Sequence, residues 1–225
     1  MNMNFSPLTL SIKAAFIATC ITSILGIVLA YLVINIKGRY KSLLDGILTL
    51  PLILPPTVVG FFLLLIFGKN GPIGKILLLF DKSIIFSFSA TVIAATVVSF
   101  PMMYRTTRSA FEQIDSNIIS AARTLGISEF KIFYKISIPL AMPGIIAGII
   151  LSFARAMGEF GATLMLAGNI PNKTQTIPLA IFFAVESGDI KTASIWVIII
   201  IFISFISIFV LNYWSEKQLK IIGRK

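Results

Sequence analysis

The sequence contains no histidine and a single cysteine, Cys20, among its 225 residues. The lack of histidine removes the commonest metal ligand and the usual general base of enzyme active sites. Cys20 lies alone in an apolar run, so neither an intrachain disulfide nor a cysteine-based metal site can form. We therefore expect no catalytic residue and no metal site in this chain.

Charged residues are scarce too, at 12% of the chain, and only nine residues are acidic. Hydrophobic residues make up 57% and the mean hydropathy is +0.97, which is typical of a chain embedded in lipid. The 19 basic residues lie between apolar runs and not on one basic face, so nucleic-acid binding is not expected. The composition indicates an all-α integral membrane protein with one domain over 1–225.

Five apolar stretches are long enough to cross a hydrocarbon core, which takes roughly 20 helical residues. We place these transmembrane helices at about 14–35, 43–67, 84–103, 139–158 and 192–213. The first stretch is longer than the roughly 7–15 apolar residues of a cleaved signal peptide, and no small-residue cleavage site follows it. We expect it to remain as a membrane helix.

The second stretch contains the run PLILPPTVVG, with Pro51, Pro55, Pro56 and Gly60. Such helix breakers are tolerated in a membrane only where neighbouring helices or water satisfy the freed backbone groups. The sequence predicts a kinked helix packed inside the bundle.

Orientation follows from the basic residues in short loops. With the N-terminus outside, the inside segments carry twelve Lys and Arg residues and the outside segments carry six. This bias predicts a multi-pass protein of the cytoplasmic membrane with its C-terminus inside and the polar segment of about 104–138 in the cytoplasm.

The sequence of that cytoplasmic segment predicts a helix, a turn and a second helix. Asp115 or Ser116 can cap a first helix, and Gly126 stands where a left-handed C-cap is needed. Ser128 with Glu129 can begin the second helix, whose apolar residues are predicted to face the membrane domain while Lys131 and Lys135 stay solvated: Phe130, Phe133, Tyr134 and Ile136. The residues alone leave open that this is only a well-capped connection.

The same segment resembles the EAA motif of ABC importer permeases, with the spacing E-A-A, three residues, G, nine residues, I, one residue, L-P. Ser120 stands where Glu is usual and Ile138 where Leu is usual. In that family the motif forms a coupling helix that docks in a groove of a separate ATPase subunit. The resemblance implies ATPase-coupling roles for Ser120, Ala121, Ala122, Arg123, Gly126, Ile136 and Pro139.

Two further segments, LPLILPPTVVGFFLLLIFGKNGPIG (50–74) and FARAMGEFGATLMLAGNIPNKTQTIPLAIF (153–182), resemble molybdate ABC transporter permeases. This likeness implies the type I importer bundle of five transmembrane helices, a homodimer, two ATPase subunits that bind Mg-ATP, and an extracytoplasmic oxyanion-binding protein. It implies no cofactor in this chain. Tungstate and sulfate remain open as substrates, because the binding protein selects among tetrahedral oxyanions.

The run GKNGPIGK at 68–75 is similar to a phosphate-binding loop, but it has five residues between its outer glycines and Ile76 in place of Ser or Thr. We interpret it as a turn between two spans. ATP hydrolysis is therefore expected on a separate subunit and not on this chain.

Arg155 and Glu159 are charges near the outer end of the fourth predicted span, where charge is costly. Their spacing of four places them on one helix face. They either pin the helix as an ion pair or, with Gly158 and Gly161, contribute to the translocation path or gate.

Small residues recur every four positions on the fourth span, at Gly144, Gly148, Ser152 and Ala156, and predict a close helix crossing. Residues 160–191 are expected to form short helices at the outer face.

A gradient-driven secondary transporter is the remaining alternative, but the chain shows no internal repeat and few acidic residues within its spans. A membrane enzyme or a scaffold lacks support because no catalytic constellation is present.

Overall fold

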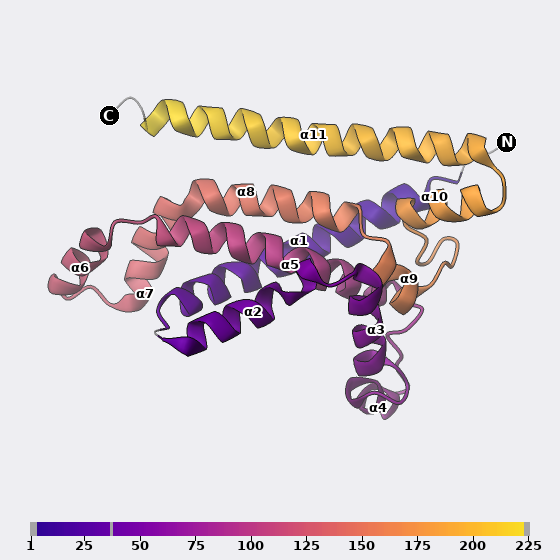
Figure 1. The fold of residues 1–225 in the computed structure, drawn as a ribbon, viewed down its shortest axis with the longest axis horizontal. Helices are drawn as coiled ribbons and strands as arrows, with labels where there is room; N and C mark the ends of the chain where they lie inside the picture. The colour runs from indigo at the N-terminus through magenta and orange to yellow at the C-terminus, as the bar shows by residue number, and fades with distance from the viewer. Residues whose placement is uncertain (1–3, 37, 223–225) are drawn as a thin grey trace.

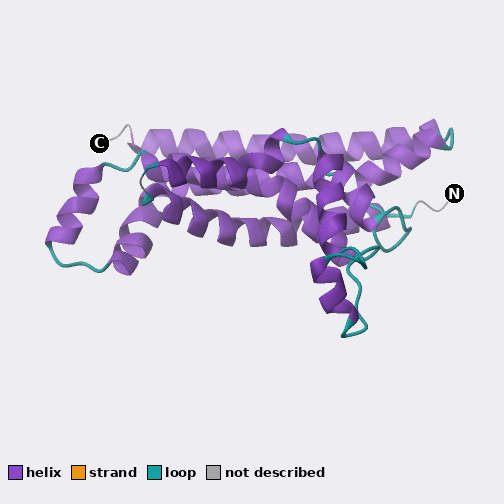
Figure 2. Cartoon of the chain, turned by 60° about the horizontal axis from the view of Figure 1, so that its bottom comes forward, coloured by secondary structure: helices purple, strands orange, loops and turns teal. Residues whose placement is uncertain are grey.

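The computed structural model describes residues 4–36 and 38–222, and within this part of the chain all regular structure is helical (Figures 1 and 2). In chain order the elements are α1 (Ser6–Ile34), α2 (Arg39–Ile53), α3 (Pro56–Phe67), α4 (Pro72–Leu78), α5 (Phe88–Glu112), α6 (Ser116–Thr124), α7 (Glu129–Ile132), the π-helical segment η1 (Phe133–Ser137), α8 (Ile138–Met157), α9 (Gly161–Ala167), α10 (Ile177–Glu186) and α11 (Ile190–Ile222).

Helices α1, α5 and α8 form the centre of the bundle (Figure 1). The face of α1 toward its neighbours carries a small residue at every fourth position, and all five are buried: Ala14, Ala18, Thr22, Gly26 and Ala30. A Cβ atom on Gly26 would lie 2.7 Å from the Cγ atom of Met103, so a larger residue would force Met103 to move. Small side chains allow the backbones to approach closely, which is how helices associate in lipid.

The predicted crossing of the fourth span is present between α8 and α5. A Cβ atom on Gly148 would lie 2.9 Å from the Met103 sulfur, and the Ser152 hydroxyl lies 3.5 Å from the carbonyl oxygen of Ser99. Ser152 is fully buried and Ala156 nearly so. The small-residue spacing therefore predicted this packing correctly.

The second predicted span is broken into two helices. α2 and α3 are bent by 112° at Leu54 and Pro55, because successive prolines lack the N–H groups that would continue the helix. The predicted kink is confirmed, but the predicted burial is wrong for α2. Of its residues only Thr49 is buried, while Ile47 and Ile53 are 57% and 77% exposed. α3 instead projects sideways and packs against α9 (Figures 1 and 2).

Two helices are longer than the sequence predicted. α5 continues to Glu112, beyond the predicted end of the third span at 103. The fourth span was predicted over 139–158, but α7, η1 and α8 form a continuous helix over Glu129–Met157. Both corrections shorten the connection between the two helices, because the polar cytoplasmic segment predicted over about 104–138 is itself largely helical.

Among the described residues, three helices are long and apolar enough to cross a membrane, α1, Glu129–Met157 and Ile190–Val210, or four if the bent pair α2 and α3 counts as one span. α5 is not among them. The total of five transmembrane helices stays a prediction.

The two ends of the bundle differ in structure. α6 and α7 lie at one end, toward which the last turns of α11 run, and α9 and α10 lie at the other, where α1 begins (Figure 1). The backbone N–H of Ile177 donates to the Ser11 hydroxyl at 2.8 Å and ties α10 to α1. The short helices predicted within 160–191 are thus present. Lys37, Arg224 and Lys225, which entered the predicted charge bias, lie outside the described residues.

The glycine-rich run at 68–75 was predicted to be a turn between two spans, but only 68–71 is a turn, and the remainder begins the short helix α4. α3 ends at Phe67 and α4 begins at Pro72. A Cβ atom on Gly74 would overlap the carbonyl oxygen of Gly68, so only glycine fits where the chain folds back here.

Candidate functional site

A capped helix projects from one end of the bundle. Asp115 begins α6 by accepting a hydrogen bond from the Asn117 N–H at 2.9 Å. At its other end the N–H of Ile127 donates to the carbonyl of Ala122 at 3.1 Å, and the N–H of Gly126 donates to the carbonyl of Arg123 at 2.9 Å. These two bonds form a Schellman motif, which requires the left-handed φ of +73° that Gly126 adopts. The predicted caps are confirmed.

An exposed ion pair connects α6 and α7. The Nε and Nη2 atoms of Arg123 donate to the two carboxylate oxygens of Glu129 at 2.7 and 3.1 Å. The hydrogen bond from the Arg123 guanidinium holds the pKa of the Glu129 carboxyl below its usual range. Two parallel bonds restrict orientation more than a single contact would.

The base of this projection is packed against the bundle by only some of the predicted residues. Ile132 is fully buried, and the ring of Phe133 lies 4.5 Å from the ring of Tyr31, centroid to centroid. Phe133 and Ile136 are partly buried as predicted. Phe130 and Tyr134 were also predicted to face the membrane domain, but they are 77% and 64% exposed. The π-helical turn changes which side chains point inward, because it adds a residue to the helical turn.

The EAA-like positions do not share one environment. Ala122 is 5% exposed and Ile136 is partly buried. Five positions are exposed: Ser120, Ala121, Arg123, Gly126 and Pro139. A cavity of about 330 Å³ opens beside α6, and its lining includes Tyr31, Asn35, Ser120, Arg123 and Ser137. The exposed part therefore presents small and polar atoms next to a hollow, a surface suited to contact with another protein.

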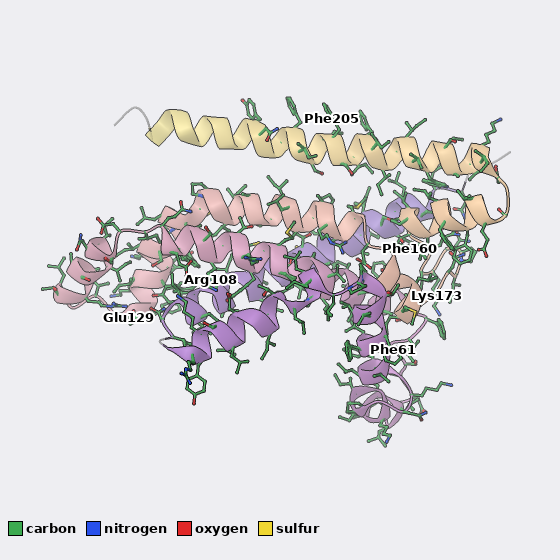
Figure 3. The ribbon with its side chains drawn as sticks, in the orientation of Figure 1. Phe61, Arg108, Glu129, Phe160, Lys173 and Phe205 are labelled. Atoms are coloured by element: carbon green, nitrogen blue, oxygen red, sulfur yellow. The ribbon has the colours of Figure 1, made fainter. Side chains whose placement is uncertain are left out.

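A second cluster lies at the opposite end of the bundle, where Figure 3 labels Phe160. The Nη1 atom of Arg155 lies 3.1 Å from a carboxylate oxygen of Glu159, which is 3% exposed. The other oxygen of Glu159 accepts a hydrogen bond from the N–H of Ala162 at 2.8 Å. The predicted ion pair is thus present, and Glu159 also caps the first turn of α9.

The neighbouring glycines serve different structural purposes. Gly158 ends α8, with open space around most of its Cα. A Cβ atom on Gly161 would lie 3.1 Å from Pro56 and Thr57, and one on Gly60 would lie 2.8 Å from the Cα of Ala162. α9 therefore lies directly against the bend between α2 and α3.

Thr174, which the sequence did not predict to be important, holds the loop after α9 together through two hydrogen bonds. The Thr174 hydroxyl donates to the carbonyl of Gly168 and accepts from the N–H of Ile170, both at 3.0 Å, and Thr174 is fully buried. Gly168 has a φ of +65°. The run GNIPNKT could have predicted this loop, because Gly168 and Pro171 favour turns and the hydroxyl of Thr174 can bond to nearby backbone groups.

Comparison with known families decides what class of protein carries these two clusters. Residues 22–221 match the family described as "Binding-protein-dependent transport system inner membrane component". The chain belongs to this family. The match includes the projecting helix α6 and the α9 region, so both clusters are parts of an inner membrane component of a transport system.

Named relatives cover nearly the whole permease. The "Putative molybdenum transport system permease protein YvgM" of Bacillus subtilis (strain 168) is 46% identical, over 91% of each chain. The "Molybdenum transport system permease protein ModB" of Haemophilus influenzae is 39% identical, over 99% of this chain and 98% of that one.

Solved structures share the fold of this inner membrane component. An inward-facing structure of the MetNI methionine ABC transporter matches with a TM-score of 0.72 at 14% identity, over 94% of each chain. A bacterial alginate ABC transporter in complex with a periplasmic protein matches with a TM-score of 0.72 at 12% identity, over 95% of this chain and 78% of that one. The predicted all-α fold of a type I ABC importer permease is therefore confirmed.

Proposed function

We propose that this chain is the membrane-spanning subunit of an ATP-driven importer that moves molybdate across the cytoplasmic membrane. The observation that carries this proposal is the pair of relatives named as molybdenum transport permeases, at 46% and 39% identity over more than nine-tenths of the chain. The chain itself hydrolyses no ATP and holds no cofactor. Mg-ATP binds to a partner subunit.

The functional complex contains two copies of this chain, two ATPase subunits and an extracytoplasmic oxyanion-binding protein. The solved alginate transporter was determined with its periplasmic protein, which supports such an assembly for the fold. The exposed side of α6, with Ser120, Ala121, Arg123 and Gly126, docks on the ATPase. α6 suits this role because both of its ends are capped and the Arg123–Glu129 pair connects it to α7.

The N-terminus lies outside and the C-terminus inside. The positions of α6 and of the start of α1 at opposite ends of the bundle support this orientation. Exposed cations at the α6 end include Lys131 and Lys135, in agreement with the excess of basic residues expected on the cytoplasmic side.

Arg155 and Glu159 lie at the outer end, next to the path that the oxyanion takes between the two copies. The Arg155 side chain is 28% exposed, so its charge can act beyond its own ion pair. Arg155 supplies positive potential for the dianion, and Glu159 limits how tightly the dianion is held. Gly158 and Gly161 belong to the gate, where Gly161 lets α9 lie against the bend between α2 and α3.

Transport follows alternating access. ATP binding closes the two ATPases, brings the two α6 helices together and opens the path outward, and hydrolysis returns the inward-facing state. ATP drives the change only to the extent that the ATPases bind it more tightly in one state than in the other.

The test is ATP hydrolysis and uptake by the permease in liposomes with its ATPase, with the binding protein supplied empty or loaded with molybdate, tungstate or sulfate. Stimulation and uptake with the molybdate-loaded protein are expected. Stimulation of ATP hydrolysis only by the sulfate- or tungstate-loaded protein would support ATP-driven import but reject molybdate as the substrate. No stimulation by any loaded protein in an assembled complex would reject ATP-driven import in favour of gradient-driven transport.

A further inference from the structure

Helix α2 is held to its own chain by few apolar contacts. It packs mainly against α5, and Thr49 is its only buried residue. Leu43 and Ile47 are 62% and 57% exposed. The position of α2 therefore depends more on polar contacts than the position of α1 does, since α1 buries residues along most of its length.

These polar contacts form one cluster between α2 and α5. Asp45 on α2 accepts a hydrogen bond from the Tyr104 hydroxyl at 2.9 Å and pairs with Nη1 of Arg108. Arg108 also donates to Glu112, from Nε at 3.1 Å and from Nη2 at 3.0 Å. Lys41 on α2 reaches the same Glu112 oxygen at 3.2 Å. We call these five residues the α2–α5 clamp.

The guanidinium of Arg108 is the centre of the clamp (Figure 3). It alone contacts a carboxylate on each of the two helices, Asp45 and Glu112. Its side chain is 18% exposed, and the Tyr104 side chain beside it is fully buried. Charge-assisted hydrogen bonds that are partly shielded from water are stronger and more directional than those on an open surface.

On the α5 side, the clamp is connected to α6, the helix that we propose docks on the ATPase. Glu112 is the last residue of α5, and Asp115 caps the start of α6 three residues later. A displacement of α6 therefore moves the end of α5 directly. Because Glu112 and Arg108 are bonded to Lys41 and Asp45, the same displacement acts on α2.

On the α2 side, the clamp is connected through α3 to α9 at the outer end of the bundle. α2 continues through the bend at Leu54 and Pro55 into α3, and α3 lies against α9 with no room for a Cβ atom on Gly60. Glu159, paired with Arg155, caps α9. A movement of α2 thus has a direct packed route to the residues that we place at the gate.

We propose that Asp45 and Arg108 are positioning residues that make α2 follow α5 when the coupling helix moves, and so carry that movement to α3 and α9. This inference rests on the proposed function, since it assumes that an ATPase moves α6. It adds that the energy of ATP reaches the outer end through a polar contact between two helices.

The test compares three variants with the wild-type complex of permease and ATPase. Asp45→Asn keeps an acceptor for Tyr104 but removes the charge opposite Arg108. The double variant Asp45→Arg with Arg108→Asp exchanges the two charges. Arg105→Gln is the matched control, because Arg105 lies on the same helix, is exposed and forms no ion pair within the described residues.

The first readout is the ATP-dependent change in hydrogen exchange of α3 and α9, which needs no oxyanion. The second is the number of molybdate ions imported per ATP hydrolysed. Asp45→Asn should reduce both about tenfold, a size usual for coupling between sites, while Arg105→Gln leaves them unchanged. The charge-exchanged double variant should recover only part of the loss, because the carboxylate introduced by Arg108→Asp lies beside Glu112.

An Asp45→Asn complex that assembles and shows the wild-type exchange change at α9 would overturn the proposal. So would a variant with faster exchange in α2 but unaltered import per ATP, since the clamp would then only stabilise the fold. A wild-type complex that imports no molybdate rejects the proposed substrate instead, and the exchange readout still decides on the clamp.

Discussion

Gly126 is a residue whose backbone conformation limits what can replace it. Its φ of +73° lies in the left-handed region, and open space surrounds its Cα. An alanine there costs about 1–2 kcal/mol of backbone strain without any clash. We expect Gly126→Ala to loosen the end of α6 and to lower the stimulation of ATP hydrolysis by the loaded binding protein, measured in liposomes.

The matched control for this change is Gly188→Ala. Gly188 has a φ of +79° and equally open surroundings, but it lies between α10 and α11 at the opposite end. Both variants should lose similar thermal stability. Equal loss of stimulated hydrolysis in both would contradict a specific role for the turn after α6.

Glu159 combines two interactions in one buried side chain, and substitutions can separate them. Glu159→Ala removes the ion pair and leaves the Ala162 N–H without its acceptor, so we expect a loss of about 1–3 kcal/mol in a thermal unfolding assay. Glu159→Gln should cost less, because its amide oxygen can still accept from Ala162. Equal costs for both variants would show that the cap contributes nothing.

Arg155→Gln tests whether this pair acts on the anion. The variant retains a long polar side chain, and Glu159 keeps its bond to Ala162. We expect it to fold and assemble but to import molybdate more slowly at low concentration, measured as initial uptake rate. Normal uptake by a correctly assembled variant would reduce Arg155 to a structural role.

At the scale of helices, the backbones of α3 and α9 approach each other so closely that there is no room for a side chain at Gly60. Gly60→Ala would place a methyl group 2.8 Å from the backbone of Ala162, which cannot rotate away, and should destabilise the fold by about 1–3 kcal/mol. Gly46→Ala on α2 meets nothing within 4 Å and should stabilise its helix by about 0.5–1 kcal/mol. The measurement is the thermal midpoint of each purified variant, and a reversed order would show that α3 and α9 separate readily.

The same scale shows where helix prediction succeeded and where it failed. The caps at Asp115 and Gly126 were predicted because each depends on a few adjacent residues. The continuity of α7 into α8 was missed because Pro139 suggests a helix start. In the structure Ile138 donates to the carbonyl of Phe133, five residues back, and this π-type bond carries the helix past the proline.

At the scale of the whole molecule, the orientation in the membrane can be measured directly. Single cysteines can replace Ser120 on α6 and Lys173, in a Cys20→Ser background. α6 and Lys173 lie at opposite ends of the bundle (Figures 1 and 3), and both positions are exposed. A thiol reagent that cannot cross the membrane should label Lys173→Cys in intact cells or spheroplasts and Ser120→Cys only after lysis. The reverse pattern would place α6 outside and exclude contact with a cytoplasmic ATPase.

The sequence by itself determined the membrane environment, the helical class and the capped projection, because composition and local hydrogen bonding suffice for each. The resemblance of a few spaced residues supplied the family. Only the tertiary structure decided which apolar faces are buried, how sharply the second span bends, and that Asp45 meets Tyr104 across 59 residues of chain. The reason is physical: these features depend on contacts between distant segments, and in a chain that is apolar almost throughout, hydrophobicity does not distinguish a face that meets protein from one that meets lipid.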